Sequence, residues 1–244
     1  MININGLWIG TKLSTMEILS IKSHMAQNHS YHLWCYQKPE NTPQGVIIED
    51  ASQILPPEDV FCYQVGPGTG SPSAFSNLFR SKFLHEIGGW WADTDVIALK
   101  TFSFSSDIVF ASERNKEGWF APATCVIKLP KGHPISNDCY KSAFNKDRAK
   151  LRWGEIGPNL LKEMICKHQL DEFVLSPDIF CPIDWFDFSH LLNESMEWPI
   201  ESYSIHLWHE MWRRSGQNKD GNFVNGCIYE KLKNKFLKSD LKFL

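Results

Sequence analysis

Two aspartates one residue apart carry the side chains of this sequence best suited to chemistry. Asp93 and Asp95 lie in the stretch 90–99, which we interpret as one buried strand because its other residues are mostly apolar. Side chains at alternate positions of a strand share a face, so both carboxylates would converge and Thr94 would point away. Converging carboxylate oxygens suit Mn²⁺ or Mg²⁺, which often complete their coordination with substrate phosphates. The pair therefore predicts a metal site and a diphosphate-bearing substrate.

The residues before this pair predict a helix that leads directly into the strand. Apolar side chains recur every four residues, as one face of a helix requires: Phe75, Phe79, Phe83 and Ile87. Ser71 is placed to cap the start of the helix, Pro72 suits its first position, and Gly88 suits its end.

Strand and helix patterns alternate through the rest of the first half of the chain. Strands are expected at 2–9, 31–36, 46–48, 108–111 and 125–129, and helices at 14–29, 134–150 and 158–168. Ser14 and Glu17 have the spacing of a capping box at the start of the first helix. This alternation predicts an α/β fold, which we divide into one domain over 1–225 and a C-terminal helix over 226–244.

The C-terminal segment has the pattern of a basic amphipathic helix. Its apolar residues fall on one side, at Tyr229, Leu232, Phe236 and Phe243, and its lysines on another, at Lys231, Lys235, Lys238 and Lys242. Two interpretations stay open. The helix packs on the domain with a solvated lysine face, or it rests on an anionic membrane surface.

Composition narrows the class of protein. The chain has 244 residues, of which 43% are hydrophobic and 22% charged, as in ordinary globular proteins. A net charge of −3 argues against a nucleic-acid partner. The seven cysteines are scattered without a CxxC pair, which is typical of reduced cytosolic thiols. Neither a signal-peptide pattern nor an apolar run of about 20 residues is present, so we expect a cytoplasmic protein.

A set of residues around the aspartates carries a family resemblance. These are Asn77, Arg80, Leu84, Gly88, Gly89, Trp91, Asp93 and Asp95. In order and spacing the set resembles the pattern D-x-x-R-x-x-x-L-x-x-x-G-G-x-Y-x-D-x-D of DXD-containing glycosyltransferases of the family 32 type. Asn77 replaces the usual aspartate and Trp91 the usual tyrosine, which leaves the donor sugar open.

Two flanking segments extend the resemblance. Leu7-Trp8-Ile9-Gly10 is similar to the first-strand I-W-x-G of these enzymes, which lies along the uracil and ribose of the donor. His206, Trp208 and Trp212 are similar to their C-terminal H-x-W-x-x-x-W. The resemblance implies a GT-A-like fold, in which a single nucleotide-binding domain has a central, mostly parallel sheet flanked by helices and the DxD at its carboxyl edge.

The resemblance also implies roles for individual residues. Mn²⁺ (or Mg²⁺) would be held by Asp93, Asp95 and His206, and would neutralise charge on the departing nucleotide diphosphate. The UDP-sugar donor would contact Leu7, Trp8, Ile9, Asn77, Arg80, Asp93 and Trp212, with the Trp212 indole N–H donating to a phosphate. The catalytic set would be Asp93, Asp95, Arg80 and Glu155. Glu155 is the candidate base for an inverting reaction, whereas the retaining reaction implied by the family needs none.

Each of these residues also has a purely structural interpretation. Arg80 would pair with a carboxylate elsewhere in the fold, Trp8 would belong to the core, and His206 would be a buried structural histidine. Glu155 would simply stand near the start of the helix at 158.

The leading hypothesis is a metal-dependent enzyme that moves a hexose, with galactose or glucose favoured, from a UDP-sugar to a lipid-linked or oligosaccharide acceptor. Resemblance to short bacterial enzymes places it in O-antigen or capsule (lipopolysaccharide-type) synthesis, with peripheral contact at the inner membrane face left open. One alternative is a non-catalytic sugar-nucleotide or carbohydrate-binding protein, which the change at Asn77 motivates. Another is a haloacid-dehalogenase-type phosphatase, because Asp93-Thr94-Asp95-Val96 matches its D-x-D-x-V loop.

Overall fold

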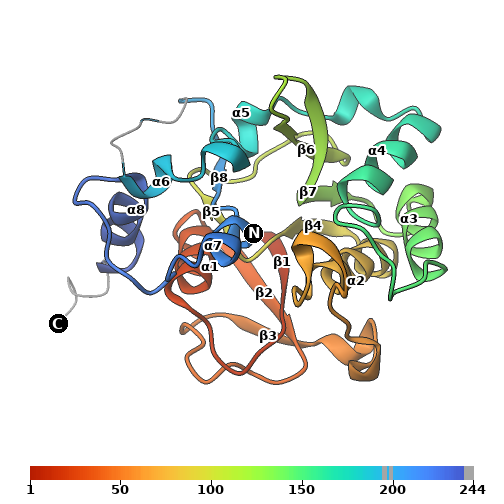
Figure 1. Cartoon of the computed structure of the whole chain (residues 1–244), viewed down its shortest axis with the longest axis horizontal. Helices are drawn as coiled ribbons and strands as arrows, with labels where there is room; N and C mark the ends of the chain where they lie inside the picture. Colours follow the sequence, from red (N-terminus) through yellow and green to blue (C-terminus); the bar gives the residue numbers. More distant parts are fainter. Residues whose placement is uncertain (194–196, 198–199, 239–244) are drawn as a thin grey trace.

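A computed structural model describes residues 1–193, 197 and 200–238. A six-stranded sheet forms its centre, in the order β3-β2-β1-β4-β7-β6 (Figure 1). The strands are β1 (Ile2–Trp8), β2 (His29–Cys35), β3 (Ile47–Asp50), β4 (Gly89–Ala92), β6 (Val109–Arg114) and β7 (Phe120–Leu129). The first four in spatial order are parallel, and β7 is antiparallel to both of its neighbours. The predicted α/β fold with a mostly parallel sheet is confirmed.

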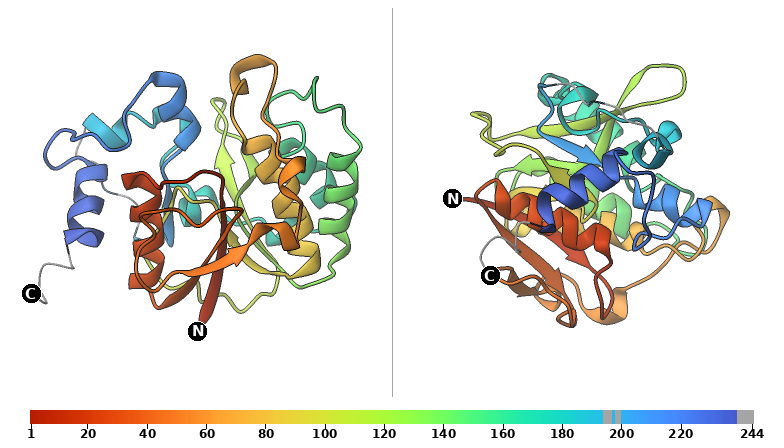
Figure 2. Two further views of the ribbon diagram at one scale, coloured as in Figure 1. Left: turned by 90° about the horizontal axis from the view of Figure 1, so that it is seen from below. Right: turned by 90° about the vertical axis from the view of Figure 1, so that its left-hand side faces the viewer.

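Helices cover both faces of this sheet, as Figure 2 shows. One face carries α1 (Thr15–Ala26), α6 (His190–Asn193) and α8 (Ile228–Phe236), and the other carries α2 (Ser73–Glu86), α3 (Pro134–Phe144) and α4 (Pro158–Lys167). The remaining helices are α5 (Pro177–Phe180) and α7 (His209–Ser215), with short 3₁₀ turns at Ala51–Gln53, Pro57–Asp59, Gly66–Gly68, Asp171–Phe173 and Trp185–Asp187. Each face therefore has its own hydrophobic core.

Helix α2 buries most of the predicted apolar stripe. Phe75, Phe79 and Phe83 are fully buried against the sheet, whereas Ile87, expected to continue the stripe, is 47% exposed because the helix ends at Glu86. Gly88 follows with a φ of +74°, where side chains other than glycine are strained. The predicted glycine stop is therefore confirmed, and it turns the chain into β4.

The prediction of a single strand over 90–99 is wrong. Strand β4 ends at Ala92, and the Val96 N–H donates to the Asp93 carbonyl at 3.0 Å, which closes a turn over the two aspartates. The chain then leaves the main sheet as β5 (Val96–Ala98) and pairs antiparallel with β8 (Ser204–His206). The turn, and not the alternation of a strand, sets the directions of the two carboxylates.

Several predicted boundaries also move. Helix α1 begins at the expected capping box, in which the Ser14 N–H donates to Glu17 Oε2 at 2.7 Å, but it ends at Ala26 because Asn28 turns the chain with a φ of +60°. The helix predicted to reach residue 150 ends at Phe144. Strand β7 begins five residues before the predicted start because it forms a hairpin with β6.

The C-terminal helix α8 packs on the domain. Tyr229, Leu232 and Phe236 are buried, and the helix contacts α1 and α6. Lys242 and Phe243, which the predicted amphipathic pattern included, lie outside the described residues. None of the helices within the described ranges is long and apolar enough to cross a bilayer.

Candidate metal and donor site

The pairing of β5 with β8 brings a histidine to the two aspartates. Val96 lies opposite His206 in the register, and the Leu207 N–H donates to the Asp95 carbonyl at 2.9 Å. His206 Nε2 lies 3.2 Å from Asp95 Oδ2. One potential ligand atom each from Asp93, Asp95 and His206 lies within 4.8 Å of the other two. The structure therefore assembles the three residues predicted to hold the metal, from two segments distant in sequence.

Asp95 is held as an anion. Its side chain is nearly buried, and its Oδ2 atom accepts a 2.8 Å hydrogen bond from the His209 N–H at the start of α7. Burial by itself would raise the pKa of Asp95, but the neighbouring His206 outweighs burial and holds that pKa well below its ordinary value. His206 shows the converse. Burial lowers its pKa, yet Asp95 raises it well above the ordinary value, so the two residues form an ion pair.

A strained residue follows His206. Trp208 is a bulky side chain in the left-handed region, with a φ of 58°, a conformation that costs about 1–3 kcal/mol. Its ring centroid lies 3.9 Å from that of His206, and its Nε1–H donates to the Ile183 carbonyl at 2.8 Å. The strained turn directs the His209 N–H at Asp95. Strain of this kind is common where a site requires a fixed geometry.

Asp93 is positioned by two donors on one oxygen. Arg80 Nη2 and Trp91 Nε1 donate to Asp93 Oδ1 at 2.5 and 2.7 Å, while 24% of the Asp93 side chain stays exposed. Burial raises the pKa of Asp93, Arg80 opposes that rise, and the charge of Asp95 adds to it. Two nearby carboxylates that disfavour each other's charge, together with an imidazole, fit a divalent cation of the Mn²⁺ or Mg²⁺ type.

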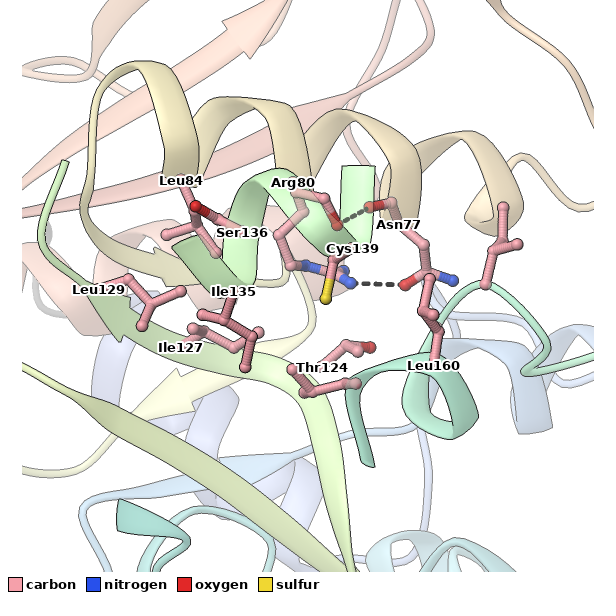
Figure 3. Close-up of a pocket in the computed structure, with 14 residues that line it drawn as sticks. Asn77, Arg80, Leu84, Thr124, Ile127, Leu129, Ile135, Ser136, Cys139 and Leu160 are labelled. Atoms are coloured by element: carbon pink, nitrogen blue, oxygen red, sulfur yellow. Dashed lines mark hydrogen bonds between the residues drawn. The ribbon is translucent and has the colours of Figure 1, made fainter. Parts of the chain in front are cut away.

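Arg80 and Asn77 lie together in a closed part of the molecule (Figure 3). Arg80 Nη1 donates to Asn77 Oδ1 at 2.5 Å, and the two residues are 4% and 8% exposed. The cavity beside them, between α2, α3, α4 and β7, measures about 20 Å³, which is room for one water molecule and not for a sugar. Asn77 thus supports Arg80, and Arg80 supports Asp93. The structural interpretation of Arg80 expected it to pair with a carboxylate elsewhere in the fold. Arg80 does pair with a carboxylate, but that carboxylate is Asp93 of the candidate site.

A cleft of about 400 Å³ opens at the end of β1 and has the size of a small-molecule pocket. Trp8 lines it with a half-buried ring, its Nε1–H donating to the Lys12 carbonyl at 3.2 Å. Lys219 Nζ lies 5.5 Å from the centre of that ring. Of the three first-strand residues predicted to contact the donor, only Trp8 lines this cleft, because Leu7 is 8% exposed in the core and Ile9 packs against the same core.

His209 links a residue of the cleft electrostatically to the carboxylates. His209 donates its backbone N–H to Asp95, and the charges of Lys219 and Asp95 both act on its imidazole. Burial is the largest influence and lowers the pKa of His209, and Lys219 lowers it further. The charge of Lys219 in the cleft and that of Asp95 therefore act on one imidazole.

Trp212 has a different place from the predicted one. Its side chain is fully buried, and its Nε1–H already donates to the Leu207 carbonyl at 2.7 Å. The ring packs edge-on against Tyr229 of α8, with centroids 4.7 Å apart. The prediction that Trp212 donates to a donor phosphate is therefore wrong. The residue instead fixes the segment that follows His206.

Glu155 lies in the loop before α4, where its carboxylate is already engaged. Glu155 Oε2 accepts from the Arg152 N–H at 3.1 Å and Oε1 lies 3.0 Å from Lys146 Nζ. The Arg152 N–H holds the pKa of Glu155 below its ordinary value, with Lys146 acting in the same direction. No contact joins Glu155 to the aspartates or His206 among the residues that the structure describes.

Two residues near the site had no sequence signal strong enough to single them out. Lys219 is a single lysine outside any sequence motif. Its Nζ lies 2.6 Å from Oε1 of Glu17, which belongs to α1 near the N-terminus. Glu113 stands opposite Ala121 on β6 and is half-buried. Burial raises the pKa of Glu113 to about 7, while the charge of His206 lowers it and that of Asp184 raises it. The sequence signal for Glu113 was a single glutamate near the end of an apolar strand.

Comparison with known proteins agrees with these observations. Residues 128–236 match the family described as the alpha 1,4-glycosyltransferase conserved region, which includes His206 and Lys219 and begins after the aspartates. No curated protein sequence matches the chain.

Three solved structures are similar in fold. The PaToxG glycosyltransferase is 19% identical with a TM-score of 0.51, over 70% of this chain and 71% of that one. A cysteine-to-serine double mutant of a transferase is 11% identical with a TM-score of 0.48, over 71% of this chain and 91% of that one. The apo form of the glycosyltransferase GlyE of Streptococcus pneumoniae TIGR4 is 12% identical with a TM-score of 0.43, over 98% of this chain and 64% of that one.

The first of these similarities concerns the fold and agrees with the predicted GT-A-like arrangement of sheet and helices. The family match concerns the C-terminal part of the same domain. The predicted resemblance to family 32-type glycosyltransferases is confirmed as a similarity: residues 128–236 match the alpha 1,4-glycosyltransferase conserved region, and the fold is similar to that of a solved glycosyltransferase.

Proposed function

We propose that this protein is a glycosyltransferase that moves a hexose, with galactose or glucose favoured, from a UDP-sugar to a lipid-linked or oligosaccharide acceptor. The observation that carries the proposal is the convergence of Asp93, Asp95 and His206. A cleft lined by Trp8 and Lys219 adds support, because the charges of Lys219 and Asp95 both act on His209. Carboxylates and an imidazole suit a cation that binds a diphosphate, and an aromatic ring beside a lysine suits a nucleoside phosphate. These features support a nucleotide-sugar as the donor.

In this proposal Mn²⁺ or Mg²⁺ is held by Asp93, Asp95 and His206, and when bound it supplies Lewis-acid neutralisation of the departing diphosphate. The protein's own part is positioning. Arg80 and Trp91 fix one oxygen of Asp93, and His209 fixes one of Asp95. Lys219 supplies a positive charge in the cleft, and the exposed part of Trp8 flanks the base.

The proposal assigns no role as a catalytic base to Glu155, because its carboxylate is already bound by Lys146 and the Arg152 N–H. This fits the retaining outcome that the family resemblance implies.

The proposed setting is bacterial surface polysaccharide synthesis, of the O-antigen or capsule type, with the enzyme in the cytoplasm. Peripheral membrane contact through α8 has little support, because Tyr229, Leu232 and Phe236 face the core. A membrane contact would have to use the lysine side of the helix alone.

The direct test measures UDP release from a panel of UDP-sugars with Mn²⁺, with and without EDTA. We expect metal-dependent release that falls by more than about a hundredfold in Asp95→Asn, because that variant removes a charged metal ligand. Asp107→Asn is the matched control, since Asp107 is 84% exposed and pairs with Lys128, away from the aspartates of the site. Equal release from the Asp95 variant would contradict the assignment. Binding of UDP with Mn²⁺ but no release would favour the non-catalytic alternative, and loss of aryl-phosphate hydrolysis in Asp93→Asn would favour the phosphatase.

A further inference from the structure

A second group of potential metal ligands shares His206 with the carboxylate site. The sulfurs of Cys125 and Cys181 are 3.4 Å apart, and a ring nitrogen of His206 lies within 4.8 Å of both. Cys125 belongs to β7, Cys181 follows α5, and His206 ends β8, so three separate elements bring the three side chains together. The proposed transfer reaction uses neither cysteine.

The cluster is buried and has an unsatisfied member. Cys125 is 2% exposed and Cys181 fully buried, and both are free thiols. His206 Nδ1 is buried without a hydrogen-bond partner within the described part of the chain. An unpartnered buried nitrogen is unfavourable, so a ligand at this point has a specific polar atom to satisfy.

The donor set differs in kind from that of the carboxylate site. Two sulfurs and an imidazole select Zn²⁺ and similar thiophilic cations, whereas carboxylate oxygens select Mn²⁺ and Mg²⁺. Sulfurs on a tetrahedral zinc ion, with Zn–S bonds of about 2.3 Å, are about 3.8 Å apart, so the pair would have to open by a few tenths of an ångström. Three protein ligands leave one coordination position for water.

We propose that Cys125, Cys181 and His206 form a site for a thiophilic divalent cation of the Zn²⁺ class, coupled to the catalytic metal site through His206. On uptake the two thiols and the protonated His206 each lose one proton, the two thiolates and the freed imidazole nitrogen bond to the cation, and three protons are released to solvent. No change of oxidation state is involved.

Occupation of this site acts on both aspartates. His206 holds Asp95 through Nε2 at 3.2 Å, and the carbonyl of Cys125 accepts the Asp93 N–H at 2.8 Å. A cation that draws Cys125 and His206 together therefore displaces groups that the Mn²⁺ site needs. The thiophilic cation is thus an inhibitor of the enzyme, and this consequence alone rests on the proposed function.

Cadmium is the probe, because Cd²⁺ bound to thiolates gives an ultraviolet charge-transfer band. Titration of the metal-free full chain is expected to give that band with one Cd²⁺ per chain. Cys125→Ser and Cys181→Ser are each expected to weaken Cd²⁺ binding by more than about tenfold. Cys166→Ser is the matched control, since that cysteine is exposed, and it should keep the band. Circular dichroism checks that each variant folds. If Cys125→Ser does not fold, because Cys125 lies in β7, the test depends on Cys181→Ser, which leaves that strand unchanged.

Three results would overturn the site. The first is absence of the charge-transfer band, and the second is a band that survives in both the Cys125 and the Cys181 variants. The third is a count of titratable thiols in denaturant that is two fewer than the sequence contains, because that count would mean that the two cysteines form a disulfide. These results do not depend on turnover, so they are distinct from failure of UDP release. In the active enzyme, Zn²⁺ added with excess Mn²⁺ should inhibit the wild type and spare Cys181→Ser. Equal inhibition of both would place the inhibitory cation elsewhere.

Discussion

The charge on Asp93 is kept in place by Arg80, and this pair shows how single residues organise the site. Arg80 is 4% exposed, spans from α2 to the turn after β4, and stacks with its guanidinium carbon 5.2 Å from the Trp91 ring centre. Asn77 occupies one of its remaining donors. The aspartate usual in the family would add a negative charge here and compete with Asp93 for the same guanidinium. The neutral amide leaves the full charge of Arg80 to Asp93.

The raised pKa of Glu113 predicts how the free energy of unfolding depends on pH. Its pKa is raised by burial to about 7 from an ordinary 4.5, so the folded chain binds a proton that the unfolded chain releases between these values. Wild-type stability contributed by this group is therefore full below about pH 4.5 and is lost as the pH rises to about 7. Glu113→Gln removes this dependence, and we expect its stability relative to wild type to rise by about 1–2 kcal/mol from pH 4.5 to 8, allowing for partial exposure.

Urea unfolding with EDTA at several pH values measures this difference. Glu117→Gln, in the exposed turn next to β6, is the control and should show no such trend. A flat difference for Glu113→Gln would mean that the carboxylate is solvated in the native protein.

At the scale of elements, the connection from α2 to β4 sets where the aspartates begin. Gly88 has a φ of +74°, and a β-carbon on it would lie 2.4 Å from the Lys131 nitrogen. Gly89 also has a positive φ, of +85°, but no atom lies within 4 Å of an added β-carbon. We expect Gly89→Ala to lose about 1 kcal/mol of unfolding free energy from backbone strain, and Gly88→Ala to lose at least about 2 kcal/mol from strain and overlap. Urea denaturation of the two variants decides this, and an equal loss would show that the 130–131 backbone moves freely.

Elements set by local pattern were predictable from the sequence, and those set by distant pairing were not. The capping box of Ser14 and Glu17 and the buried stripe of Phe75, Phe79 and Phe83 require only neighbours along the chain. The break after Ala92 depends on β8, which lies far along the sequence, so an apolar stretch of ten residues gave no sign of it. Cross-sheet pairing overrides the local pattern at this point.

The convergence of the predicted metal ligands could be predicted because these residues belong to sequence motifs. Asp93, Asp95 and His206 come together, although a turn and a second small sheet achieve this and not the expected strand. Trp212 was misassigned because the partner of an indole N–H depends on the three-dimensional environment. Lys219 was missed because a single lysine has no pattern.

At the scale of the whole molecule, segments from the N-terminal and C-terminal parts of the chain meet at the cleft beside Trp8. Trp8 and Glu17 come from the first strand and helix, and Lys219 and Asp220 from the segment between α7 and α8. Asp220 Oδ1 accepts from the Thr15 N–H at 2.7 Å, which ties this segment to the start of α1. A ligand in the cleft would thus contact segments that are distant in the sequence.

This arrangement predicts that Lys219 acts on the nucleotide as well as on Glu17. Because Glu17 is fully buried, Lys219→Met alone would leave an unpaired buried charge and confuse the result. The double variant Lys219→Met with Glu17→Gln removes both charges and keeps the capping-box residue type. We expect it to fold, and to bind UDP with Mn²⁺ about tenfold more weakly by calorimetry, since a charged hydrogen bond to phosphate contributes about 1.5–3 kcal/mol. Lys235→Met, on the exposed side of α8, should bind as the wild type does. Unchanged UDP affinity in a folded double variant would mean that Lys219 only joins the two chain ends.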